Sequence, residues 1–252
     1  GEKSRTDLCL CYMSDRVSPR LLEQIRQDLE HMQLETILPS GYVRPFLERR
    51  DWRIFHTTGT TERPDVLCSK LLEGRVALLI DGTPFAIFLP KLFVENFQTL
   101  DDYTCKPYYA AFVRWIKYLA FFLALLLPGI YTAIALHHPE LLNSTLLQLL
   151  TEAEANAPFS LMTESIGVLL MYEVIREAGI RLPKAVGGAV SIVAGLIIGD
   201  AAVSSGFIST PLLTVTALSV TTGFVIPELS HEITVFRFLF ILCGGLWGLF
   251  GI

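Results

Sequence analysis

The residues best suited to chemistry in this sequence are a few ionisable and small side chains set within long apolar stretches. Ala185 to Ser205 contains 21 residues and a single charge, Asp200. At about 1.5 Å per residue, a helix of that length spans about 30 Å and can cross a bilayer. Small residues recur along it at steps of four: Gly187, Ser191, Gly195 and Gly199. Such spacing is typical of helices that pack closely in lipid, and it also suits the wall of a pore.

We predict that this helix lines or borders an ion path. An intramembrane carboxylate such as Asp200 usually faces protein or water, although this one lies near the helix end and could simply reach the interface. The apolar residues of the helix could form a constriction that gates by dewetting. The pore or gate candidates are Val190, Ser191, Val193, Ala194, Ile197, Ile198 and Asp200. The alternative is that the small residues seal a helix contact within one subunit.

A second group of ionisable residues lies in Phe159 to Ala178, a half-apolar segment with a helical pattern. These intramembrane charges are Glu164, Glu173, Arg176 and Glu177. Glu173 and Arg176 are three residues apart and can pair on a helix. A helix with four charges cannot face lipid on all sides, so it must face protein or water if it spans the membrane. The sequence leaves open whether it spans or lies at the interface.

Other kinds of site find little support in the sequence. The Ser, His and Asp residues form no nucleophile elbow, and no glycine-rich phosphate loop is present. The five cysteines lack zinc spacing, and the adjacent His137 and His138 point in different directions on a helix. The net charge of −5 argues against nucleic acid as a partner. We therefore expect a protein that is not an enzyme and that has no cofactor and no metal.

The charges divide the chain into a polar and an apolar part. Residues 1–106 hold 14 of the 20 Lys and Arg residues and 16 of the 25 Asp and Glu residues. We predict an α/β cytoplasmic domain at 1–106, followed by an α-helical multi-span membrane domain at 107–252. The chain does not begin with Met and ends within an apolar run. We therefore expect a fragment cut at both ends.

The polar part is expected to contain a strand, two helices and a β-hairpin. Residues 7–13 have β character, and Ser18 is the expected N-cap of an amphipathic helix. Residues 42–47 suggest a short helical piece, and a second helix should end at Gly74. The expected hairpin pairs Val76 to Ile80 with Thr83 to Leu89 around the turn Asp81-Gly82. Arg49 to Thr61 is polar and irregular.

The apolar part is expected to cross the membrane several times. The predicted spans are Tyr118 to Leu136, Ala185 to Ser205, Phe207 to Ile226 and the run that begins at Phe238, with Leu141 to Glu154 lying near the interface. The short joint at Ser204-Ser205-Gly206 predicts an antiparallel hairpin of the second and third spans. Arg114, Lys117, Arg181 and Lys184 should lie on the cytoplasmic side and His137-His138 on the opposite side. Phe159 to Ala178 would then have to return across the membrane.

Several stretches resemble one known family in their content and order. They are TERPD (61–65), LEGRVA (72–77), DGTPFA (81–86), REAGIRLP (176–183), VSIV (190–193), IG (198–199) and LFGI (249–252). Together they resemble the GerA family, which comprises the A subunits of spore germinant receptors and the related SpoVAF-type proteins. The resemblance covers nearly the whole chain from about residue 5.

This resemblance implies a multi-pass protein of the spore inner membrane. It implies a two-part cytoplasmic N-terminal domain, of which this chain would keep the second half. It also implies a homo-oligomer that forms an ion channel and releases monovalent cations when a nutrient is sensed. The implied partners are a transporter-like B subunit, a lipoprotein C subunit and membrane lipid. The family commonly has a neutral polar residue where this chain has Asp200, so a pore charge there is not inherited from the family.

Two other classes of function remain alternatives. A small-solute transporter would bind its substrate near the middle of the membrane, usually within inverted repeats, and no repeat is visible here. A non-conducting scaffold would tolerate the loss of Asp200, Glu164 and Glu173. Ion flux through the reconstituted subunit would separate a channel from both.

Overall fold

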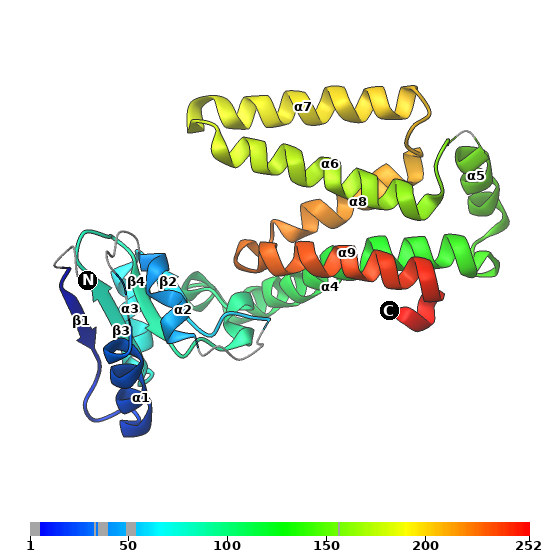
Figure 1. Ribbon diagram of the computed structural model, residues 1–252. Coiled ribbons are helices and arrows are strands. Elements are labelled where there is room, and N and C mark those ends of the chain that lie inside the picture. The colour runs from blue at the N-terminus through cyan, green and yellow to red at the C-terminus, as the bar shows by residue number, and fades with distance from the viewer. Residues whose placement is uncertain (1–5, 33, 35–39, 49–53, 156) are drawn as a thin grey trace. The chain divides into compact units, whose positions relative to one another are not determined.

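The structure is a computed structural model that describes residues 6–32, 34, 40–48, 54–155 and 157–252. The side chains of residues 40, 184–187, 189–191, 194 and 198 are also outside the description. The chain divides into two compact units, unit 1 at Gly1–Pro107 and unit 2 at Tyr108–Ile252 (Figure 1).

Unit 1 is a small antiparallel sheet with helices. The strand order is β1-β3-β4-β2, so the predicted hairpin, β3 and β4, forms the centre. The elements are β1 (Leu8–Cys11), α1 (Pro19–Glu30), η1 (Ser40–Tyr42), α2 (Arg44–Leu47), β2 (Gly59–Thr61), α3 (Pro64–Leu72), β3 (Val76–Ile80), β4 (Ala86–Leu89), η2 (Phe93–Phe97) and η3 (Leu100–Tyr103). β2 was not predicted, since its three residues lie in the stretch that was expected to be irregular.

The core of unit 1 follows from the alternation of side chains along the central strands. Val76 and Leu78 of β3 lie opposite Leu89 and Ile87 of β4, so all four share one face. α1 and α2 cover this face and contribute Ile25, Val43 and Leu47 to the same cluster. On the opposite face of β3, Ala77 is also buried, whereas Leu79 is 39% exposed, so that face is only partly covered.

The hairpin loop is longer than predicted. β4 begins at Ala86 instead of Thr83, because Pro84 cannot donate to the ladder and the Phe85 N–H bonds to Thr83 Oγ1 at 3.2 Å. Gly82 has a φ of +81°, a conformation that side chains with a Cβ rarely adopt. Gly74 likewise has a φ of +84° and ends α3, as predicted. Ser18 does occupy the N-cap of α1, but its side chain makes no capping hydrogen bond.

Glu48 organises a polar cluster beside α2. Its Oε1 accepts a hydrogen bond from Thr58 Oγ1 at 2.6 Å, and its Oε2 lies 2.9 Å from His56 Nδ1. Arg44 Nε donates to the same carboxylate at 3.1 Å. Burial of Glu48 raises its pKa, but the hydrogen bonds from Thr58 and His56 outweigh that effect, so the pKa lies below its ordinary value.

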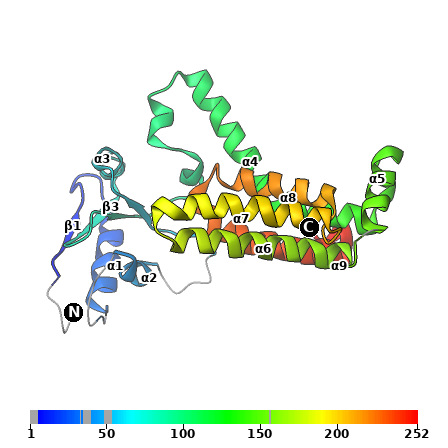
Figure 2. The ribbon, with the colours of Figure 1, turned by 90° about the horizontal axis from the view of Figure 1, so that it is seen from above.

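Unit 2 consists of helices. They are α4 (Pro107–His137), η4 (Pro139–Leu141), α5 (Ser144–Ala155), α6 (Leu161–Arg181), α7 (Lys184–Ser204), α8 (Thr210–Gly223), η5 (Pro227–Leu229), α9 (Ser230–Trp247) and η6 (Gly248–Gly251). Figures 1 and 2 both show α7 alongside α6, and Figure 1 shows α8 and α9 on the other side of α6 from α7. α6 is therefore the central helix of the unit, since it packs against α7, α8 and α9.

Two helical segments in the described part of the chain are long and apolar enough to cross a membrane. They are Pro107–His137 and Pro227–Gly251. The predicted span Phe207 to Ile226 forms a shorter helix, because α8 starts only at Thr210, followed by Pro211, and ends at Gly223. Its 14 residues cover about 21 Å. The predicted hairpin also differs, since α7 packs mainly against α6 and not against α8.

Close helix packing in unit 2 occurs between α4 and α9. A Cβ at Gly129 would lie 2.8 Å from the Phe240 carbonyl oxygen, and a Cβ at Gly244 would lie 2.6 Å from the Gly129 carbonyl oxygen. Backbone atoms cannot yield as a flexible side chain would, so both positions need glycine. The contact joins the two helical segments that are long and apolar enough to cross a membrane.

Candidate functional site

Pro128 leaves one backbone carbonyl of α4 without its helical donor. In a regular helix the Ala124 carbonyl would accept the N–H of residue 128, but proline has no N–H. Ala124 is fully buried and Pro128 is buried within the same helix. A buried carbonyl without a partner is costly, so another donor must reach Ala124.

Two side chains from other helices supply that donor. Ser219 Oγ of α8 donates to the Ala124 carbonyl at 2.8 Å, and Arg237 Nε of α9 donates to the same oxygen at 2.9 Å. Arg237 Nη2 also donates to the Ser219 carbonyl at 3.2 Å. We call this arrangement of Ala124, Ser219 and Arg237 the Ala124 junction. It ties α4, α8 and α9 together at one point.

Arg237 is an unusual residue for the interior of an apolar helix bundle. Its side chain is 3% exposed, and arginine is almost never so buried unless its charge is paired or well bonded. The carbonyls of the Ala124 junction bond the guanidinium, and the Glu173 carboxylate is close enough to interact with its charge. This junction was not predicted from the sequence. The signal was present as a proline inside one apolar run and a single arginine inside another.

A second set of polar contacts ties α6 to its neighbours. Arg176 Nη2 pairs with Glu173 Oε2 at 2.7 Å, as the sequence spacing predicted. Thr234 of α9 lies between them, with its Oγ1 3.0 Å from Glu173 Oε1 and 3.4 Å from Arg176 Nη1. The hydroxyls of Thr132 on α4 and Ser165 on α6 lie 3.2 Å apart. α4, α6, α8 and α9 therefore form a bundle that is connected through its interior by polar contacts.

α7 packs within unit 2 mainly against α6. A groove of about 620 Å³ is lined by residues of α6, α7 and α8, and Gly188, Gly195 and Gly199 line its α7 side. A Cβ added at any of these three glycines would meet no atom within 4 Å. The described part of the small-residue stripe therefore makes no close contact within the subunit. The alternative that this stripe seals an intramolecular helix contact finds no support at these positions.

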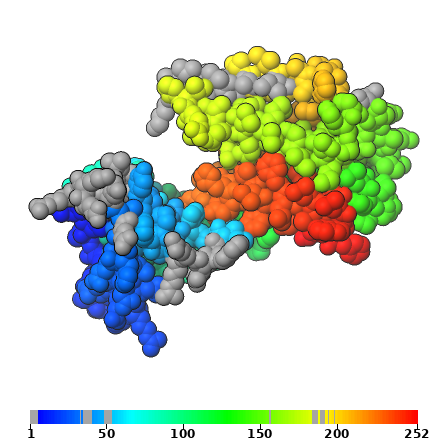
Figure 3. All heavy atoms as spheres, in the orientation of Figure 1, coloured from blue at the N-terminus to red at the C-terminus, as the bar shows by residue number. Residues whose placement is uncertain are grey.

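The predicted gate residues on α7 that can be placed lie at the surface of unit 2. Figure 3 shows the described part of α7 in yellow at the edge of the unit. Val193 is 53% and Ile197 60% exposed, beside the exposed Ile192 and Leu196. Asp200 is also exposed. The structure does not describe the side chains of the four other candidates, Val190, Ser191, Ala194 and Ile198.

The four predicted intramembrane charges have different surroundings. Glu164 is 4% exposed, and its Oε1 accepts a hydrogen bond from the Ser209 N–H at the start of α8. Glu173 and Arg176 are paired and partly buried. Glu177 is exposed and pairs with Arg181 at 2.7 Å near the end of α6. The structure therefore brings Glu173 and Arg176 together, but it separates them from Glu164 by more than two helical turns along α6.

Comparisons with known proteins give a consistent result. A family profile described as Bacillus/Clostridium GerA spore germination protein matches residues 1–252. Spore germination protein KA of Bacillus subtilis (strain 168) is 36% identical over all of this chain and 47% of its own length. Spore germination protein GerLA of Bacillus cereus is 32% identical over all of this chain and 52% of its own length. The chain thus spans about half the length of the curated relatives it matches.

A solved structure is also similar in sequence to part of the chain. The N-terminal domain of the A subunit of the Bacillus megaterium spore germinant receptor GerK3 is 41% identical, covers 35% of this chain and 34% of that chain, and gives a TM-score of 0.27. The family profile, in contrast, matches from the first residue to the last, through both units. This chain belongs to the GerA family of spore germination proteins.

Proposed function

We propose that this chain is part of the A subunit of a spore germinant receptor, located in the spore inner membrane with unit 1 facing the cytoplasm. The proposal rests on the family match over the whole chain. We further propose that the subunit assembles with copies of itself and with transporter-like B and lipoprotein C subunits. In this assembly unit 2 forms a path for monovalent cations, which are released when a nutrient is sensed.

The observation that supports conduction is the contrast between α7 and the rest of unit 2. Four helices are joined by buried polar contacts, whereas α7 packs mainly on α6 and carries an exposed apolar face. A helix attached on one side can contribute its free face to a ring of subunits. The apolar residues on that face suit a constriction that opens by wetting, and Asp200 would attract cations near one end.

Ion flux through the reconstituted protein tests this proposal. The full-length protein would be placed with its B and C partners in vesicles loaded with K⁺, and efflux would be recorded before and after nutrient is added. We expect nutrient to start K⁺ efflux and N-methyl-D-glucamine to be retained. Efflux equal to that of protein-free vesicles, at verified incorporation, would support a scaffold instead. Efflux that requires a gradient of the nutrient itself would support a transporter.

A further inference from the structure

Three buried side-chain oxygens that have no hydrogen-bond partner among the described residues belong to residues near the start of α6 and α8. Glu164 lies in the first turn of α6 and is 4% exposed. Its Oε1 accepts the Ser209 N–H, but its Oε2 is buried and meets no donor among the described residues. The Ser209 hydroxyl, on a residue 5% exposed, is also buried and unpaired in the described part of the chain. One carboxylate oxygen and one hydroxyl are therefore left without partners.

Tyr131 of α4 supplies the third oxygen. Its hydroxyl is buried and has no hydrogen-bond partner among the described residues. The ring packs against the cluster formed by Leu161, Val168 and Leu212, which joins α6 to α8. Tyr131 is close enough to Glu164 and Glu154 for their charges to interact with it. The three unpartnered atoms, from α4, α6 and the N-cap of α8, are all oxygens.

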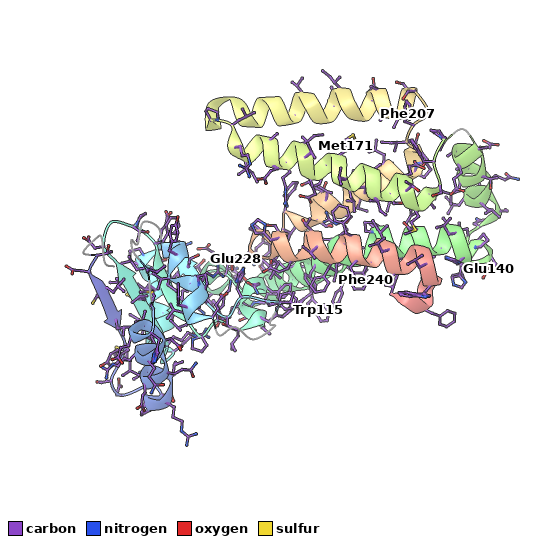
Figure 4. The ribbon with its side chains drawn as sticks, viewed as in Figure 1. Trp115, Glu140, Met171, Phe207, Glu228 and Phe240 are labelled. Atoms are coloured by element: carbon purple, nitrogen blue, oxygen red, sulfur yellow. The ribbon has the colours of Figure 1, made fainter. Side chains whose placement is uncertain are left out.

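A pocket leads to Glu164. It has a volume of about 720 Å³, and its walls come from α6, the end of α7 and the segment before α8. Met171 and Phe207, both labelled in Figure 4, line it together with Ile197. Glu164 is the one ionisable residue among the described residues of the lining, which include no basic side chain.

The electrostatics of this pocket favour a cation. The amino end of α8 and the Ser209 N–H stabilise the carboxylate of Glu164, but only at Oε1. A buried anionic oxygen without a partner is costly, and a cation at Oε2 would remove that cost. The neighbourhood is acidic, because Glu154 lies close enough to Glu164 for their charges to interact. Burial, and then the charge of Glu164, raises the pKa of the nearby Glu154.

The ligand atoms indicate which class of cation would bind. Carboxylate and hydroxyl oxygens are hard ligands that suit alkali and alkaline-earth ions rather than transition metals. A single carboxylate with two neutral hydroxyls balances one positive charge. We propose that Glu164, Ser209 and Tyr131 bind a partly dehydrated monovalent cation, K⁺ or Na⁺, which reaches them through the pocket. This inference rests on the proposed function only for the passage of the ion through the protein; binding of the ion does not require conduction.

Ion-dependent thermal stability tests the binding directly. The full-length protein in detergent would be melted in KCl or NaCl at increasing concentration, with N-methyl-D-glucamine chloride holding the ionic strength constant. A cation that binds the folded state raises Tm with a saturating dependence on its concentration. We expect this rise in the parent. We expect Glu164→Gln to weaken apparent binding at least tenfold, because the amide keeps the shape and the acceptor for Ser209 but has no charge.

Matched variants separate binding from general effects on folding. Glu177→Gln removes an exposed carboxylate from the same helix and should keep the parent's response to the ion. Tyr131→Phe and Ser209→Ala each remove one neutral ligand and should weaken binding severalfold. These two variants also keep the proposal testable if Glu164→Gln does not fold.

The outcomes distinguish this proposal from the proposed function. An unchanged ion response in Glu164→Gln, or in both Tyr131→Phe and Ser209→Ala, overturns the site. A parent with no response to K⁺ or Na⁺ and a Glu164→Gln variant of higher Tm would mean that a proton occupies the carboxyl, which also overturns it. A larger response to Ca²⁺ than to K⁺ refutes the monovalent assignment. If the ion binds but vesicles show no efflux, conduction fails and the site stands; if vesicles show efflux but no ion binds, the site fails and conduction stands.

Discussion

The Ala124 junction predicts an interaction between mutations that does not depend on any assumption about conduction. The Ala124 carbonyl has two donors, Ser219 Oγ and Arg237 Nε, and lacks its helical donor because of Pro128. Ser219→Ala or Arg237→Met removes one donor and leaves the other. The double variant leaves a buried carbonyl with no donor, which should cost about 1–3 kcal/mol more than the sum of the single variants.

Pro128→Ala should reverse that additional loss. Alanine at 128 restores the N–H that normally bonds the carbonyl four residues earlier. In the parent the carbonyl already has partners, so Pro128→Ala gains only helix propensity and relief of the proline clash. In the Ser219→Ala/Arg237→Met background the same change also satisfies the carbonyl. We expect it to stabilise that background by about 1–2 kcal/mol more than it stabilises the parent.

The free energy of unfolding of each variant would be measured in mixed micelles with increasing SDS, with the helical circular dichroism signal as the readout. Thr222→Ala is a useful control in each background, since its hydroxyl donates within α8 and not to Ala124. If the gain from Pro128→Ala is the same in both backgrounds within about 0.5 kcal/mol, the junction is not the partner of the freed carbonyl.

Three further predictions concern packing, the hairpin turn and pH. Gly129→Ala should destabilise the protein in the same SDS assay, because the added Cβ would lie 2.8 Å from the Phe240 carbonyl oxygen. Gly195→Ala, where a Cβ meets open space, should raise the free energy of unfolding by about 0.5–1 kcal/mol through helix propensity, and equal effects of the two variants would contradict the packing. Gly82→Val should cost unit 1 about 1–3 kcal/mol through strain at positive φ, and a thermal melt matching that of the parent would refute the turn. The folded-state pKa of Glu48 lies below its unfolded value, so the ionised carboxylate stabilises the folded protein fully above the ordinary glutamate pKa, and this stabilisation is lost as pH falls through the folded pKa. Glu48→Gln should therefore flatten the acid side of a curve of Tm against pH, and an unchanged slope would oppose this.

The sequence predicted elements well where a local physical signal was strong. The N-terminal strand, the helix after Ser18, the end of α3 at Gly74 and the pairing of β3 with β4 all depend on periodicity or on glycine conformation. β2 was missed because three residues carry no usable alternation. The start of β4 was placed three residues early because a proline and a Thr side-chain turn occupy the loop. Local patterns thus set the elements of unit 1 but not their limits.

In unit 2 the sequence predicted helices but not their partners. The run from Phe207 to Ile226 is uniformly apolar, and hydropathy alone could not show that the helix within it is limited to Thr210–Gly223. Nor could spacing show that the α7 glycines meet open space while Gly129 and Gly244 make the close contact. The Ala124 junction depends on three helices that are distant in sequence. Such contacts are tertiary, so they follow from the fold rather than from any one segment.

The measurement that tests the central claim most directly is resting K⁺ efflux through variants trimmed on α7. Val193→Ala and Ile197→Ala would be reconstituted at matched oligomer content, together with the corresponding changes at Val190 and Ile198. Val235→Ala, which trims an exposed valine on α9, is the control. If α7 forms the gate, trimmed variants leak K⁺ without nutrient while Val235→Ala stays as tight as the parent. Efflux indistinguishable from the parent at all four α7 positions would contradict the claim that this helix gates an ion path.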